Sequence, residues 1–247
     1  MSDLHSVRYG DGPRVFVGLH GWNGGSGIFA SLEPHLPSDV SILAFGLPGY
    51  GDSPAPEEWS LPAVGRQIVD AIDERGIDRF SILGNCSGAI IGLYVARTAR
   101  RRIDEFLLVE PFAWVPSYLS IFLTPVVGSL FYWSAFGNPV GRAITNRALA
   151  GQRQESTDML ASFKRSPLWV PMRYLTLFDE AGKARDYADI PGEKRILRGD
   201  RTFEAVRESV EAWGATWPDA EVQILEGAGH LLLQEAPREA AAFLFDR

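Results

Sequence analysis

The chain has 247 residues and a formal net charge of −7. Its length fits one α/β domain with an insertion, and its acidic balance argues against a nucleic-acid surface. The single Cys excludes an intramolecular disulfide, and the four His show no spacing typical of a metal site, so we expect neither a metal nor another cofactor. The first residues lack the basic start and apolar run of a signal peptide, which favours a cytoplasmic protein.

Apolar runs alternate with helical patterns along most of the chain. The runs that predict strands are residues 14–19, 41–45, 80–83, 106–110, 194–198 and 221–226. The patterns that predict helices are residues 61–75, 89–101, 203–217 and 237–245. This alternation indicates a mostly parallel sheet, because successive strands become parallel through helical crossovers.

A sharp turn is predicted where the strand at 80–83 meets the helix at 89–101. Gly84, Cys86 and Gly88 form the pattern G-x-nucleophile-x-G, in which a strand-to-helix turn raises one side chain above the sheet. The glycines fit because larger side chains would clash where the turn is tightest. This turn resembles that of the α/β-hydrolase family, with a thiol where most members carry Ser.

Three further segments resemble the same family and follow its chain order. Residues 15–22 run from an apolar strand into a His-Gly turn ending at Trp22, where the family builds half of its oxyanion hole. Residues 45–53 resemble the loop after the next strand, and residues 226–237 resemble the loop with the catalytic His. The resemblance implies an α/β-hydrolase fold, a mostly parallel central sheet flanked by helices, with residues 1–112 and 189–247 as its core.

The middle of the chain differs in composition. Residues 111–141 contain no charged side chain and many aromatic ones, but Pro and Gly interrupt them, so we do not expect a membrane span. The resemblance implies that residues 113–188 form an apolar helical lid. Its apolar residues would pack on the core, wall an acyl pocket, or both, while contact with a membrane surface or a partner is less expected. The predicted pocket residues are Trp114, Tyr118, Phe122 and Phe131.

The resemblance gives catalytic roles to Cys86 and His230. Cys86 would attack the substrate, and the backbone amides at the start of the following helix favour its thiolate form. His230 would move the protons from the loop after the last predicted strand. The backbone amides of Trp22 and Ser87 would form the oxyanion hole. His20 is expected to brace its turn, because the family uses backbone amides there.

The acid that orients His230 departs from the usual pattern. Family members commonly carry Asp in the motif Gly-x-x-Asp after the penultimate strand, but this chain has Thr202 at that position. Asp200 is close in sequence, although its place near the strand end should aim it differently. Glu110 is the preferred candidate, because it ends an apolar strand, the sixth of the family's core, as the acid does in a subgroup of haloalkane dehalogenases.

A thiol nucleophile narrows the predicted chemistry. Dehalogenation needs an Asp nucleophile and is excluded, whereas polyhydroxyalkanoate synthases and dienelactone hydrolases are relatives with Cys in this turn. We expect a Cys-dependent hydrolase (a thioesterase or esterase) that acts on an acyl ester or thioester through an acyl-enzyme, with water as the default acceptor. The substrate would be a small acyl compound, free or presented on coenzyme A or a carrier protein.

Other interpretations stay open from the sequence. The acyl group could pass to an amine, an alcohol or another nucleophile, which would make the protein an acyltransferase or condensing enzyme. A ligand-binding protein that has lost turnover is a second alternative, favoured by Thr202. A module that docks on a membrane or partner through residues 111–141 is a third. Cys86 could also stand in place of a natural Ser.

Overall fold

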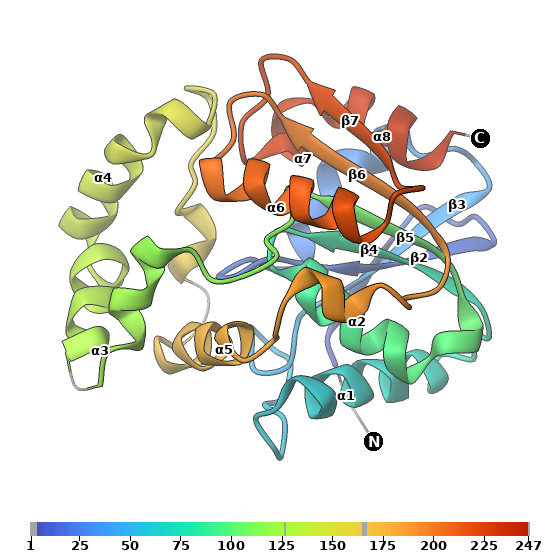
Figure 1. Cartoon of the computed structure of the whole chain (residues 1–247), viewed down its shortest axis with the longest axis horizontal. Coiled ribbons are helices and arrows are strands. Elements are labelled where there is room, and N and C mark those ends of the chain that lie inside the picture. The colour runs from blue at the N-terminus through green and yellow to red at the C-terminus, as the bar shows by residue number, and fades with distance from the viewer. Residues whose placement is uncertain (1–3, 126, 165–166, 247) are drawn as a thin grey trace.

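A seven-stranded sheet forms the centre of the computed structural model, which describes residues 4–125, 127–164 and 167–246 (Figure 1). Its order is β1-β3-β2-β4-β5-β6-β7, and only the β1–β3 pair within it is antiparallel. The mostly parallel sheet predicted from the sequence is therefore confirmed. The strands are β1 (Ser6–Tyr9), β2 (Arg14–Leu19), β3 (Val40–Phe45), β4 (Phe80–Asn85), β5 (Ile103–Val109), β6 (Glu193–Gly199) and β7 (Glu221–Leu225).

Helices cover both faces of the sheet. Buried side chains of α1, α2 and α6 share one hydrophobic core, while α8 and the 3₁₀ helix Ser26–His35 share the core of the other face. The side chain of Ser60 caps α1, whose apolar residues recur every three or four positions and face the sheet. The covering helices are α1 (Leu61–Asp73), α2 (Gly88–Thr98), α6 (Glu204–Thr216), α7 (Leu232–Glu235) and α8 (Pro237–Phe245).

Two differences from the predicted elements concern short or terminal pieces of chain. The sequence pattern missed β1, an edge strand of four residues that is too short to show a clear alternation. The strand predicted at 106–110 is β5, which begins earlier and ends at Val109. Glu110 follows it with a φ of 53°, outside the extended region, so it belongs to the loop and not to the strand.

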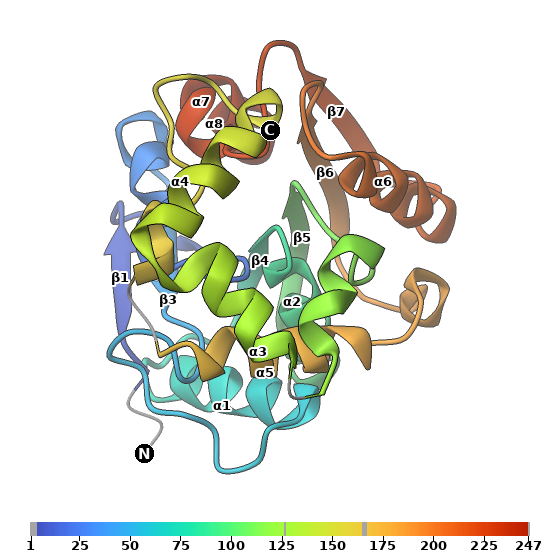
Figure 2. The ribbon, with the colours of Figure 1, turned by 90° about the vertical axis from the view of Figure 1, so that its left-hand side faces the viewer.

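The long connection between β5 and β6 is helical and stands where the parallel strands end (Figure 2). This insertion contains residues 113–188, which the sequence predicted to form a lid. Positions 126, 165 and 166 of this range lie outside the described residues, as do positions 1–3 and 247 of the predicted core. A π-helical turn, Trp133–Gly137, continues its first α-helix. The α-helices of the insertion are α3 (Val127–Tyr132), α4 (Pro139–Ala148) and α5 (Trp169–Asp179).

The apolar side chains of the insertion lie in three different environments: a small core, a cavity and the solvent-exposed surface. Phe122, Tyr132 and Phe136 belong to a small core that is separate from the two cores of the sheet, and Phe122 and Phe136 also line the cavity described below. Leu130, at 61% exposure, is one of several large apolar side chains that face solvent. Within the described residues no single helix is long and apolar enough to cross a membrane. The bent pair Ser117–Leu123 and Val127–Gly137 reaches the necessary length and apolar composition only when its two helices are taken together.

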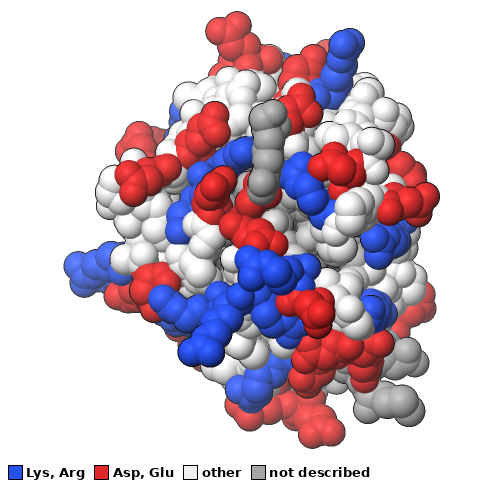
Figure 3. All heavy atoms as spheres, turned by 90° about the vertical axis from the view of Figure 1, so that its right-hand side faces the viewer, with Lys and Arg blue, Asp and Glu red and all other residues white. Residues whose placement is uncertain are grey.

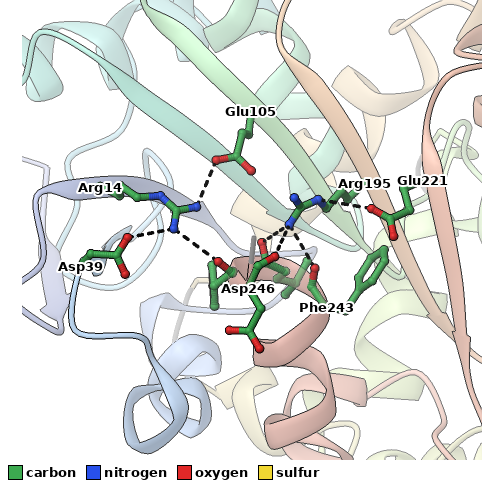
Figure 4. Close-up of polar contacts among 9 residues, drawn as sticks. Arg14, Asp39, Glu105, Arg195, Glu221, Phe243 and Asp246 are labelled. Carbon is green, nitrogen blue, oxygen red and sulfur yellow. Dashed lines mark hydrogen bonds and ion pairs between the residues drawn. The ribbon is translucent and has the colours of Figure 1, made fainter.

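Arginine side chains bind carboxylates at the end of the sheet where the parallel strands begin, which is the end opposite to the insertion. Figure 3 shows basic side chains gathered at the centre of this face with acidic ones around them. Arg14 binds Asp39 at 3.0 Å and the buried Glu105 at 3.3 Å, and Arg195 donates to the carbonyl of Phe243 at 3.2 Å (Figure 4). These contacts tie β2, β5, β6 and the C-terminal helix α8 together at the edge remote from the ends of the parallel strands.

Substitution of Gly88 should destabilise the fold, because a Cβ there would lie 2.1 Å from the carbonyl oxygen of Leu19. We expect Gly88→Ala to lower the free energy of unfolding by at least about 3 kcal/mol in urea denaturation, since backbone atoms cannot yield as side chains do. Gly214→Ala is the matched control: a Cβ at Gly214 in α6 meets open space. It should leave stability unchanged or raise it by about 0.5–1 kcal/mol. Equal losses in both variants would contradict the steric explanation.

Candidate active site

Cys86 lies at the tip of the turn between β4 and α2. Its φ of 55° is unusual for a residue with a side chain, and its N–H donates to the carbonyl of Val109 at 2.8 Å. The two glycines of the turn are required by close packing, because a Cβ at Gly84 would lie 2.8 Å from the Cα of Ala89. The strained backbone thus holds the thiol above the carboxyl end of the sheet.

Glu110 occupies the corresponding position on the neighbouring strand. Asn85 pairs with Val109 in the β4–β5 register, so Cys86 and Glu110 both come directly after the last paired residues. Glu110 is fully buried, and its Oε2 lies 2.8 Å from Nδ1 of His230. The imidazole also interacts with the side chain of Cys86, and both residues line the cavity described below. The structure therefore brings Cys86, His230 and Glu110 together in one chain of contacts.

Thr202 lies beside Glu110 and not in its place. Its hydroxyl donates to Oε2 of Glu110, and the N–H of Gly199 donates to Oε1 at 2.6 Å. These donors offset the cost of burying a carboxylate. Asp200 is exposed, and its Oδ1 accepts the N–H of Gly227 at 2.8 Å, so the structure does not bring it to His230. Thr202 acts as a support of the carboxylate, a role that the sequence did not suggest.

The protonation of His230 depends on the charges beside it. Burial by itself lowers the pKa of the imidazole, but the interactions with Cys86 and with the carboxylate of Glu110 outweigh it and raise the pKa from 6.5 to about 10. His230 therefore carries its proton at neutral pH and loses it only as the pH rises through about 10.

His20 braces the neighbouring loop, as its sequence context predicted. It is fully buried, its Nε2 accepts the N–H of Leu47 at 3.1 Å, and its Nδ1 lies 2.8 Å from the carbonyl oxygen of Gly21. The proton consequently sits on Nδ1. Burial lowers the pKa of His20 to about 4, against the smaller opposing effect of the Gly21 carbonyl. His20 thus stays neutral and holds the turn that carries Trp22.

The predicted oxyanion donors, Trp22 and Ser87, both line the cavity above Cys86. Ser87 directly precedes α2, so its N–H has no partner within the helix. The N–H of Trp22, by contrast, donates to the hydroxyl oxygen of Ser87 at 2.8 Å. The indole of Trp22 is also fixed, because its N–H donates to the carbonyl of Pro171 at 2.7 Å.

A cavity of about 610 Å³ opens above the thiol and is walled by the insertion. Three of the four predicted pocket residues, Trp114, Tyr118 and Phe122, line it. The prediction for Phe131 is wrong: it is 45% exposed and does not line the cavity. The reason is helical geometry, since the buried side of that helix carries Tyr132 and Phe136 instead. In the described part of the chain no three His, Cys, Asp or Glu side chains converge as metal ligands would.

Several contacts that support His230 were not predicted. The carbonyl of Gln152, in the insertion, accepts the N–H of His230 at 2.7 Å. Glu235 accepts the N–H of Gly229 at 2.6 Å and that of Gln154 at 2.8 Å, which joins the His loop to the insertion. Gln152 and Gln154 are distant from His230 in sequence, and the only available signal was the carboxylate of Glu235, five residues after His230.

Comparison with known proteins agrees with this architecture. The sequence model of the Alpha/beta hydrolase family matches residues 15–243, and the chain belongs to this family. A pimeloyl-[acyl-carrier protein] methyl ester esterase of Neisseria meningitidis is 30% identical over 100 residues, which cover 40% of this chain and 30% of that protein. Lipase LipV of Mycobacterium tuberculosis is 28% identical over 44% of this chain and 42% of its own length. The chain thus matches less than half of each of these relatives.

Solved structures show the same fold with varied activities. A structure from a study of carboxylesterases of the thaumarchaeon Nitrososphaera gargenis has a TM-score of 0.75 and 14% identity, covering 98% of this chain and 92% of that chain. A bromoperoxidase of Bacillus anthracis has a TM-score of 0.73 and 14% identity, covering 96% of this chain and 92% of its own. Because one fold carries both activities, the chemistry has to be argued from the site.

Glu110→Gln should impair turnover far more than Asp200→Asn. A Gln amide cannot balance the positive imidazolium, so we expect a loss of roughly 100-fold or more in kcat for p-nitrophenyl butyrate hydrolysis. Asp200→Asn should stay within about threefold, since Asp200 only supports the Gly227 loop. Similar losses in the two variants would move the acid away from Glu110.

Removal of the thiol should lower the pKa of His230. In Cys86→Ala the imidazole loses both the negative charge and the hydrogen bond that raise its pKa, while Glu110 remains. We expect an NMR titration of the His230 ring to show a pKa below that of the wild type, which lies near 10. An unchanged pKa in Cys86→Ala would mean that the sulfur is not paired with the imidazole. The buried His20 ring serves as the internal reference.

Proposed function

We propose that the protein is a Cys-dependent hydrolase of acyl esters or thioesters that works through an acyl-enzyme. The observation that carries this proposal is one chain of contacts: the side chain of Cys86 interacts with an imidazole whose Nδ1 lies 2.8 Å from a buried carboxylate. This arrangement has a nucleophile, an acid–base group and an orienting group in the order that acyl transfer requires. The hydrolases, esterases and lipases among its relatives support the same reaction class.

The proposed reaction has two steps, acylation of Cys86 and hydrolysis of the acyl-enzyme. The sulfur of Cys86 attacks the carbonyl carbon, and the electron pair of the carbonyl bond moves to oxygen. When this oxyanion collapses, the bond to the alcohol or thiol breaks, and the leaving group takes the proton from His230. Water then attacks the thioester, His230 accepts its proton, and the acid is released as the Cys86 thiolate returns.

The cavity favours a neutral, apolar acyl group. Aromatic side chains of the insertion form much of its wall, and among the described residues neither Lys nor Arg lines it. A substrate that ended in a second carboxylate would lose hydration there without meeting a Lys or Arg side chain. The methyl ester in the name of one relative fits an uncharged ester in this kind of site, although that relative shares only part of its length with this chain.

A thiol nucleophile also favours activated donors. The acyl-enzyme is itself a thioester, so transfer from a coenzyme A or carrier-protein thioester is nearly balanced in energy. An oxygen ester of an ordinary alcohol is a less reactive donor, and its leaving group depends more on the proton of His230. We therefore propose that thioesters react faster than alkyl esters of the same acyl chain.

Intact-mass measurement tests the proposal. The protein is incubated with p-nitrophenyl esters and coenzyme A thioesters of acetyl, butyryl and octanoyl groups, and an adduct of the acyl mass is expected on Cys86. Cys86→Ala should fold normally and form no adduct, because no other Cys exists in the chain. The same adduct on the variant, or no adduct on the wild type with any donor, would refute the proposal. Decay of the adduct in buffer alone identifies water as the acceptor, and decay that requires an added amine identifies transfer.

A further inference from the structure

The hydroxyl of Ser87 occupies the place where an oxyanion donor is expected. The N–H of Trp22 points at the Ser87 hydroxyl oxygen, 2.8 Å away, and not into open space. Ser87 is buried, at 5% exposure, yet it lines the cavity beside Cys86. No acceptor for its hydroxyl proton is found among the residues that the structure describes. The group therefore receives one hydrogen bond and retains a proton that it can donate.

Packing and a hydrogen bond fix the loop that carries Trp22, so the backbone N–H of Trp22 cannot readily turn away from the Ser87 hydroxyl. The indole ring packs against Phe122, Tyr132 and Phe136 of the insertion at centroid distances of 6.4, 5.7 and 5.8 Å. Its N–H is bonded to the carbonyl of Pro171. Turning the Ser87 hydroxyl away would instead leave the Trp22 N–H of this part-buried bond without its partner.

We infer that the Ser87 hydroxyl donates directly to the oxyanion and that the Trp22 amide acts through it. A hydroxyl that accepts a hydrogen bond is polarised and becomes a better donor, so the Trp22 N–H strengthens the Ser87 O–H. The oxyanion would then be held by two donors of one residue, the N–H and the O–H of Ser87. This inference rests on the proposed acyl chemistry at Cys86. It makes Ser87 a catalytic residue through its side chain as well as through its backbone N–H.

The inference is tested with Ser87→Ala, Ser87→Thr and the wild type in two reactions of the same sulfur. The first is acylation by p-nitrophenyl butyrate, followed as the single-turnover release of p-nitrophenolate. The second is alkylation by iodoacetamide, which needs the thiolate but forms no oxyanion. Thermal unfolding of each variant shows that the fold is intact.

Ser87→Ala should acylate on the order of 100-fold more slowly, as expected for the loss of one oxyanion donor. Its alkylation should stay within about twofold of the wild type, and Ser87→Thr should recover acylation to within about tenfold. Acylation of Ser87→Ala at the wild-type rate or faster would show that the hydroxyl merely covers the Trp22 amide. An equal fall in acylation and alkylation would show that the Ser87 hydroxyl acts on the thiolate and not on the oxyanion. Each of these two results would overturn the inference but leave the proposed function standing. A wild type that is alkylated but never acylated would overturn both.

Discussion

The hydrogen bond between Glu110 and His230 is the interaction on which the site depends. A fully buried carboxylate is costly unless it is paired, and this one accepts bonds from the Gly199 amide, the Thr202 hydroxyl and the imidazole. The carboxyl ends of β5 and β6 and the His loop are thereby fixed to one another. The thiol then needs only to be placed opposite the other nitrogen of the ring, and the strained turn after β4 does this.

Register in the parallel sheet explains how Cys86 and Glu110, which lie apart in sequence, come to face one imidazole. Asn85 pairs with Val109, and Val109 pairs with Leu197, so the chain leaves three neighbouring strands at the same level. Cys86 and Glu110 both adopt a left-handed backbone at that level. The backbone N–H of each of these two residues donates a hydrogen bond to a carbonyl of the adjacent strand. The sheet thus supports backbone conformations that would be unfavourable in an isolated loop.

Much of this arrangement follows from local sequence, and the remainder depends on contacts that no local pattern encodes. The apolar runs and the spacing of Gly84 and Gly88 predicted the sheet and its sharp turn, because both are set by short-range sterics. The choice between Glu110 and Asp200 depended on where two side chains point. Phe131 was misplaced because the uncharged segment gives no sign of which helical side is buried. The Trp22–Ser87 bond joins two separate loops, so the sequence could identify both residues but not their contact.

The carbonyl of Gln152 has a consequence for how the insertion can change. It accepts the backbone N–H of His230, and the same stretch of chain is bound to the His loop through Glu235. The insertion therefore cannot be exchanged as an independent unit, because replacing it with the insertion of a relative would also remove part of the scaffold behind the imidazole. Diversification of its specificity should proceed by point changes in the insertion, with Gln152 and Gln154 retained together with the C-terminal loop that they contact.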